Sequence, residues 1–230
     1  MANTQSALNK MISGEIAYRT LDNELAGREV FDLLFYEQGC TLRAQCEMNN
    51  IGLLRDVSLA LDHEWLPKDA FCRLINRDGV SGSCWYFFNE TSVLVEGENG
   101  GVRFSQQLSN QPGYHYLGLH PLQGDALIAQ QVDNSRPGEF VPVNSLTNSI
   151  SENGDGGLMA TGLVIEVAFL GMETVTVTAG SFNARKLALR WHRDWPPATL
   201  WVREGDALFL KMTWSQVDYW YELVSLVERG

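Results

Sequence analysis

Apolar and polar residues alternate one by one through much of this sequence, and no other feature restricts the fold as strongly. In Thr41–Met48, for example, Leu42, Ala44, Cys46 and Met48 share one side, and the residues between them are polar. Side chains of a β-strand point alternately to opposite faces, so this pattern predicts strands with one dry and one wetter face. The same pattern recurs in Val57–Leu61, Arg185–His192 and Ala207–Trp214.

Short turn motifs separate the alternating segments. Asp78-Gly79, Asn99–Gly101 and Glu204–Asp206 are typical of hairpin tips, and Ala179–Ser181 is another tight connection. About ten strands joined by short turns indicate an antiparallel meander and not alternating β and α units. We therefore expect a mainly β fold, an antiparallel curved sheet or partial barrel, in a single domain over residues 1–230.

Two segments interrupt the alternation. Pro121–Val132 has a proline suited to a first helical turn and apolar residues at helical spacing, so it predicts one short helix. Asn134–Gly157 is rich in Gly and Pro and predicts a long loop, which we expect to cover one end of the barrel. The halves Gly14–Leu108 and Leu158–Val227 are both rich in strand patterns and suggest two facing sheets.

Charge and motif content exclude several function classes. A formal net charge of −11 disfavours nucleic acid and anionic membrane surfaces as partners. The polar segment Met1–Lys10 lacks the apolar centre of a signal peptide, so we expect a cytoplasmic protein. The cysteines lack metal-site spacing and are expected to be buried, reduced thiols: Cys40, Cys46, Cys72 and Cys84. There is no nucleotide-binding glycine motif, and no pair of His and carboxylate residues has metal-site spacing, so we expect neither a cofactor nor a metal. The lack of a G-x-S-x-G motif leaves hydrolase chemistry without local support.

The segment Gly171–Arg185 reads GMETVTVTAGSFNAR. It resembles the strand–turn–strand signature G-x-E-T-V-x-V-x-A-G-x-F of an uncharacterised bacterial family with a lipoprotein-localisation-like half-barrel fold. The later strands around Leu200–Val202, Asp206–Trp214 and Tyr219–Leu226 fit the same pattern, so the resemblance covers roughly the last 70 residues. It implies a sheet wrapped around an apolar cavity and brings no assigned catalytic residue.

The segment Gly113–Pro121 gathers two of the four histidines and two of the seven tyrosines just before the predicted helix. Neutral imidazole can accept a proton, and tyrosine hydroxyls can hold a substrate oxygen. We therefore take His120 and His115 as candidate catalytic residues, and Tyr114 and Tyr116 as candidate substrate-binding residues. The simpler interpretation is a tyrosine-rich strand whose final histidine caps the following loop.

Tryptophan and tyrosine are frequent in the strand-like segments. Core packing is the simpler explanation, but a barrel of this size can enclose a cavity, and such walls favour flat apolar ligands with a few oxygens. His192–Pro197 lies at a strand end, where it forms either part of a site or a rigid Trp-Pro-Pro corner. The candidate substrate-binding residues outside Gly113–Pro121 are Trp65, Trp85, Trp195 and His192.

These observations predict a cytosolic β protein that binds an apolar or aromatic small molecule. The favoured hypothesis adds cofactor-free acid–base chemistry on that molecule, of the lyase or isomerase type. The alternative is a non-catalytic carrier or sensor of a hydrophobic small molecule. A weaker third hypothesis is a structural homodimer that pairs through an exposed sheet edge.

Overall fold

The computed structural model describes residues 8–151, 154 and 156–230. The first part of the chain forms eight strands in succession, each antiparallel to the one before. Inward residues alternate with outward ones as the sequence predicts. On the third strand, for example, Cys40, Leu42, Ala44 and Cys46 are all buried. The strands are β1 (Lys10–Thr20), β2 (Leu25–Tyr36), β3 (Gly39–Met48), β4 (Leu53–Asp62), β5 (Pro67–Asn76), β6 (Gly79–Phe88), β7 (Ser92–Asn99) and β8 (Val102–Ser109).

After β8, the chain passes from one edge of the sheet to the opposite edge and forms seven further strands. The first two of them pair in parallel, and the rest pair antiparallel with their neighbours in sequence. They are β9 (Tyr116–Gly118), β10 (Val141–Thr147), β11 (Thr161–Val177), β12 (Gly180–Arg190), β13 (Ala198–Arg203), β14 (Phe209–Thr213) and β15 (Tyr219–Arg229). The predicted tight turns at Asp78-Gly79, Asn99–Gly101, Ala179–Ser181 and Glu204–Asp206 are confirmed.

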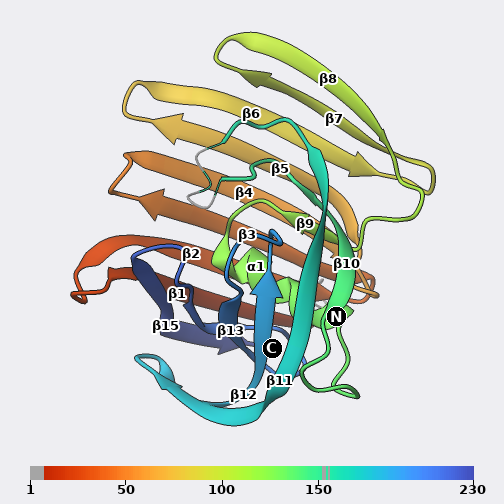
Figure 1. Cartoon of the computed structure of the whole chain (residues 1–230). Helices are drawn as coiled ribbons and strands as arrows, with labels where there is room; N and C mark the ends of the chain where they lie inside the picture. Colours follow the sequence, from red (N-terminus) through yellow and green to blue (C-terminus); the bar gives the residue numbers. More distant parts are fainter. Residues whose placement is uncertain (1–7, 152–153, 155) are drawn as a thin grey trace, which may run out of the picture.

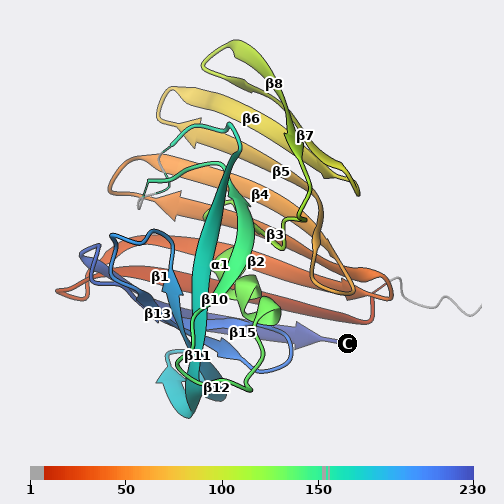
Figure 2. The same cartoon turned by 45° about the vertical axis from the view of Figure 1, so that its right-hand side comes forward.

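All fifteen strands belong to one sheet, in the order β8 to β1 and then β15 to β9. The strands nearest the two chain ends, β1 and β15, pair in its middle. The sheet curls so that β10 and β11 pass across the concave side of β3–β6, but β8 and β9 remain separate edges and the barrel is not closed (Figures 1 and 2). The predicted curved antiparallel sheet is thus confirmed. The suggestion of two facing sheets is wrong, because β1 and β15 join both halves into one, and the estimate of about ten strands was too low.

The predicted loop at Asn134–Gly157 needs correction, because β10 lies within it. Its period-two pattern is short and contains Pro142, which hid the strand from sequence reasoning; as a strand β10 pairs with β11 on one side and β9 on the other. Part of the glycine-rich stretch 153–157 and most of the segment Met1–Lys10 lie outside the described residues. No helix in the described ranges is long and apolar enough to span a membrane.

The predicted helix is confirmed and lies on the concave face of the sheet (Figure 1). It consists of α1 (Leu122–Leu127), followed directly by the 3-10 turn η1 (Ile128–Gln131). Almost every residue of α1 is buried, because the helix contacts β3 on one side and β13 and β14 on the other. The helix therefore lies between the first half of the sheet (β1–β8) and the second half (β9–β15), which we call its two wings.

Side chains from distant strands bind both ends of this helical segment. At its start, the buried Glu29 on β2 accepts hydrogen bonds from the backbone N–H groups of Leu122 (2.6 Å) and Gln123 (3.0 Å). At its end, the buried Arg185 on β12 donates to the carbonyl oxygens of Ala129 (2.8 Å) and Val132 (2.5 Å). The first N–H and last C=O groups of a helix lack partners within it, so these contacts satisfy groups that would otherwise be buried without hydrogen bonds.

The Arg185→Met variant tests this arrangement. The change roughly keeps side-chain volume but leaves buried helix carbonyls without donors, so we expect the free energy of unfolding to fall by about 2–4 kcal/mol in urea denaturation. Arg190→Met is the matched control on the same strand. It removes a partly exposed ion pair with Glu166 and should cost less than about 1 kcal/mol. Equal losses in both variants would contradict the proposed role of Arg185.

Candidate functional site

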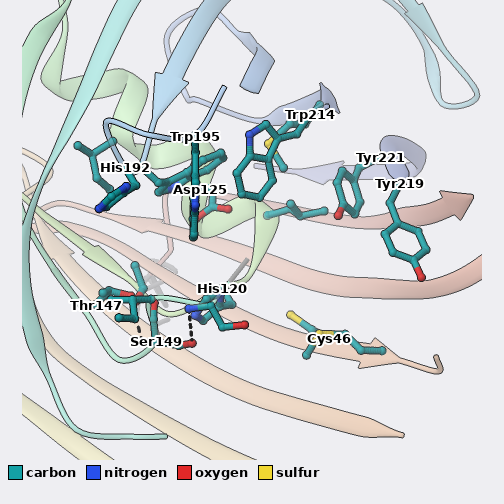
Figure 3. Close-up of a pocket in the computed structure, with 18 of the residues that line it drawn as sticks. Cys46, His120, Asp125, Thr147, Ser149, His192, Trp195, Trp214, Tyr219 and Tyr221 are labelled. Carbon is teal, nitrogen blue, oxygen red and sulfur yellow. Dashed lines mark hydrogen bonds between the residues drawn. The ribbon is translucent and has the colours of Figure 1, made fainter. Parts of the chain in front are cut away.

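A pocket of about 370 Å³ opens on the concave face, beside helix α1. Its lining comes from both wings of the sheet, from α1 and from the connections around them. Figure 3 shows Asp125, Trp195 and Trp214 in one part of the view and His120 and Cys46 in another, and all of them line the pocket. The curvature of the sheet creates the hollow, and the helix forms its floor.

Aromatic rings make up one wall of the pocket. The Trp214 ring centre lies 4.9 Å from that of Trp191 and 5.5 Å from that of Trp195, and both pairs are tilted. Tyr18 and Tyr221 meet edge to face at 5.2 Å on the neighbouring strands β1 and β15. Tilted and edge-to-face contacts are favourable arrangements for aromatic rings, so this wall is a packed surface and not a set of independent side chains.

The side chain of Asp125 projects from α1 into the lining of the pocket. The hydroxyl of Tyr116, on β9, donates a 2.6 Å hydrogen bond to its Oδ1 atom. Burial raises the pKa of Asp125 to about 7, even though the hydrogen bond from Tyr116 lowers it. A carboxyl group of this kind exchanges its proton near neutral pH, as acid–base groups in enzymes do.

A second buried carboxyl group, that of Glu29, lies near the same end of the pocket. Burial raises the pKa of Glu29 to about 7 against the lowering effect of the helix N–H groups and the Tyr18 hydroxyl, and the charge of Asp125 raises it further. Tyr18 donates a 3.1 Å hydrogen bond to Glu29 and also lines the pocket. The residue that caps the helix and the residue that faces the pocket are therefore coupled electrostatically.

His120 lies on the connection between β9 and α1, where its backbone has φ of 76°. Its ring hydrogen bonds to the Ser149 backbone, and its Nε2 atom is buried with no hydrogen-bond partner among the described residues (Figure 3). Burial, and then the positive charge of Arg55, lower the pKa of His120 well below its usual 6.5, so the imidazole is neutral at pH 7. Arg55 is fully buried and donates to the carbonyl oxygen of Gly154 and to Asn148 Oδ1.

The structure brings four of the eight residues predicted from sequence into this pocket: His120, Tyr116, Trp195 and His192. They come together because β9, which carries Tyr116, leads directly into α1, and the end of β12 reaches the same end of the sheet. His192 lies at the outer part of the lining and is more than half exposed, with its ring 5.8 Å from that of Trp195. Whether any of these residues acts on a ligand stays a prediction.

The other four predicted residues lie outside the pocket lining. His115 is exposed, because neighbouring residues at the start of a strand point to opposite faces and Tyr116 takes the inner one. Trp85 is 49% exposed on the outer face of β6, between Phe71 and Phe87, for the same reason. Trp65 packs against Phe35 in the turn before β5, and Tyr114 packs beside Gly162 on β11. All four placements correct the sequence-based expectation of a common cavity.

Sequence reasoning missed the two carboxyl groups, although a signal for each was present. Asp125 follows Leu122 at a spacing of three, which places it on the same face of the predicted helix, and both residues line the pocket. Glu29 alternates with Phe31 and Leu33 on the inner face of β2. A carboxyl group on an otherwise apolar face is costly unless it is hydrogen-bonded, so each one marks a site with a specific role.

In the described ranges, no three His, Cys, Asp or Glu side chains are grouped so that they could hold a metal ion. No protein-family profile and no curated protein matches the sequence. Among solved structures, the fold is similar to a "beta-barrel-like protein of domain of unknown function DUF1849" from Brucella abortus, with a TM-score of 0.60, 11% identity, and coverage of 97% of this chain and 98% of that one. A DUF1089 family protein from Pseudomonas aeruginosa aligns with a TM-score of 0.50, 12% identity, and coverage of 79% and 87%.

These similarities show the fold alone. They agree with the expected likeness to uncharacterised bacterial barrel-like proteins, whereas the specific signature at Gly171–Arg185 stays a prediction.

The raised pKa values of Glu29 and Asp125 predict how stability depends on pH. The ordinary pKa is 4.5 for Glu29 and 3.8 for Asp125, and the folded value of each is about 7. Between the ordinary and the folded value, the folded state binds more protons than the unfolded state. Stability from these groups is therefore complete at the acid end of this window and is lost as the pH rises through it. We expect Glu29→Gln and Asp125→Asn each to reduce the change in unfolding free energy between pH 5 and pH 7 by on the order of 1–2 kcal/mol.

Urea denaturation at a series of pH values measures this effect. Asp69→Asn, which removes an exposed carboxyl group on β5, is the control and should keep the pH dependence of the original chain. If Asp125→Asn keeps that dependence as well, Asp125 titrates in its ordinary range and the electrostatic description of the pocket is wrong.

Proposed function

We propose that the protein binds an apolar or aromatic small molecule in the pocket beside α1 on the concave face of the sheet. The observation that carries this proposal is the combination of an aromatic wall with a few polar groups at one end. Trp191, Trp195 and Trp214 offer flat apolar surface, and Asp125 and Tyr116 can orient a single polar group of the ligand. Small-molecule sites are typically apolar hollows of a few hundred Å³ with a small number of placed polar groups.

The enzymatic form of this proposal is cofactor-free proton transfer, of the lyase or isomerase type. Asp125 supports it, because a pKa of about 7 suits both proton uptake and release at neutral pH. Asp125 is therefore a better-matched acid–base group than His120, whose lowered pKa makes it a weak base. His120 keeps a second role, since its unpartnered Nε2 atom can bind a ligand group that enters the pocket.

The alternative is a carrier or sensor, which needs the aromatic lining but no proton transfer. The structural homodimer, in which an edge such as β8 pairs with its twin, is the third hypothesis. The cytoplasmic location expected from the sequence stays a prediction, and binding in the pocket does not depend on it.

A matched pair of tryptophan variants tests binding. A panel of small aromatic compounds should raise the melting temperature through binding to the folded state, and the strongest binders can then be measured by isothermal titration calorimetry. Trp195→Ala should raise Kd at least about tenfold because it removes part of the wall. Trp85→Ala, on the outer face, should leave Kd unchanged. A panel without any binder, or equal losses in both variants, would contradict the proposal.

Deuterium exchange separates the enzyme from the carrier. Each binder is incubated with the protein in D₂O, and NMR follows loss of proton signal at carbon atoms next to carbonyl or imine groups. An enzyme should catalyse exchange, and Asp125→Asn should slow it by about 10²–10⁴-fold, whereas His120→Gln should slow it less. Binding without catalysed exchange in any compound supports the carrier, and full exchange activity in Asp125→Asn excludes Asp125 as the acid–base group.

A further inference from the structure

We propose that the ligand is an organic cation, in which an ammonium group contacts the Asp125 carboxylate while the rest of the molecule lies against the tryptophan and tyrosine rings. This inference rests on the proposed function and narrows it to one ligand class. Three features of the pocket carry it: its uncovered aromatic rings, its unpaired acidic group and the lack of basic groups in its lining.

The first feature is the state of the aromatic rings. Outside the pocket, Lys or Arg side chains lie over six aromatic rings, at 4.1–5.9 Å from the ring centres. In the part of the chain that the structure describes, no Lys or Arg covers a ring of the pocket wall. The faces of Trp and Tyr attract cations, most strongly where water is excluded. The rings of the pocket wall can therefore contact a cationic ligand, as other rings of the protein contact its own Lys and Arg side chains.

The second feature is the charge of Asp125. Its hydrogen-bond partner is the neutral hydroxyl of Tyr116, and it takes part in none of the ion pairs formed within the described residues. The carboxyl group of Glu29 lies close enough to repel it. Glu29 is fully buried, and within the described residues neither carboxyl group forms an ion pair, so this end of the pocket is electronegative when they ionise. Such an end favours a cationic ligand over a neutral or anionic one.

The third feature is the composition of the lining, which contains no Lys and no Arg among the residues that the structure describes. Of its two imidazoles, His120 is neutral at pH 7, and His192 lies at the more exposed outer part. Arg55 lies behind His120, outside the lining, and is held by the Gly154 carbonyl and Asn148. An anionic ligand would therefore meet no basic partner next to Asp125.

Three probes of similar shape test the charge preference by isothermal titration calorimetry at pH 8. They are benzyltrimethylammonium, its neutral carbon isostere neopentylbenzene, and the anion phenylacetate. The cation should bind at least tenfold more tightly than the neutral isostere, and the anion should bind most weakly. Asp125→Asn should weaken the cation at least tenfold and change the neutral isostere less than threefold. Trp85→Ala should change neither.

The pH dependence gives a second readout, because the quaternary ammonium group has no proton to lose. Affinity for benzyltrimethylammonium should rise from pH 6 to pH 8 as Asp125 ionises, and Asp125→Asn should abolish most of this rise. The other titratable groups facing Asp125 are Tyr116, Tyr221 and Glu29. The same pocket is also lined by Tyr18, Cys46, His120, His192 and Tyr219. A rise that persists in Asp125→Asn but disappears in His192→Gln would overturn the assignment to Asp125.

The outcomes separate this inference from the proposed function. If the neutral or anionic probe binds as tightly as the cation and Trp195→Ala weakens them all, the pocket binds small molecules but has no cation preference. If the three probes fail while compounds of the aromatic panel bind, the cation proposal is also wrong. If neither the probes nor the panel bind, the proposed function itself fails.

Discussion

The position of helix α1 inside the curved sheet depends on the carboxyl group of Glu29 on β2, which accepts hydrogen bonds from the first backbone N–H groups of the helix. The helix is too short to be stable alone, so its place must be fixed by tertiary contacts. Gln123 extends the attachment to the opposite wing, where it exchanges hydrogen bonds with the backbone at Ala207 and Phe209. Arg185 completes it at the other end. Together these contacts fix the floor of the pocket relative to its walls.

The same arrangement explains the chemistry of the pocket. Fixing α1 places Asp125 beside Tyr116 in the lining it shares with the tryptophans, in surroundings buried enough to raise its pKa. Such a carboxyl group is costly to bury, and most residues around it are neutral or aromatic. The cost is offset if a ligand supplies the missing positive charge. The cation proposal therefore follows from the helix attachment and from the lack of basic side chains among the described residues of the lining.

The sequence predicted the strand pattern, the principal turns and the helix, because these depend on local periodicity and on Gly and Pro chemistry. It did not predict that β1 and β15 join the two halves, since that pairing links residues about 200 positions apart. For the site, residues next to the helix such as Tyr116 and His120 could be found from their clustering. Trp65 and Trp85 could not be excluded, because the strand register and the side each residue takes are decided by the sheet. Glu29 and Asp125 were overlooked because their importance comes from burial and not from a motif.

The central claim is that the pocket holds an acidic group whose ionisation is linked to a bound cation. Carbon-13 NMR of the Asp125 carboxyl carbon, titrated with and without benzyltrimethylammonium, measures this directly. The account predicts a pKa of about 7 in the free protein, in place of the ordinary 3.8, and a clear fall when the cation is bound. A carboxyl group that titrates near 3.8 in the free protein, or whose pKa does not change when the cation is added, would contradict it.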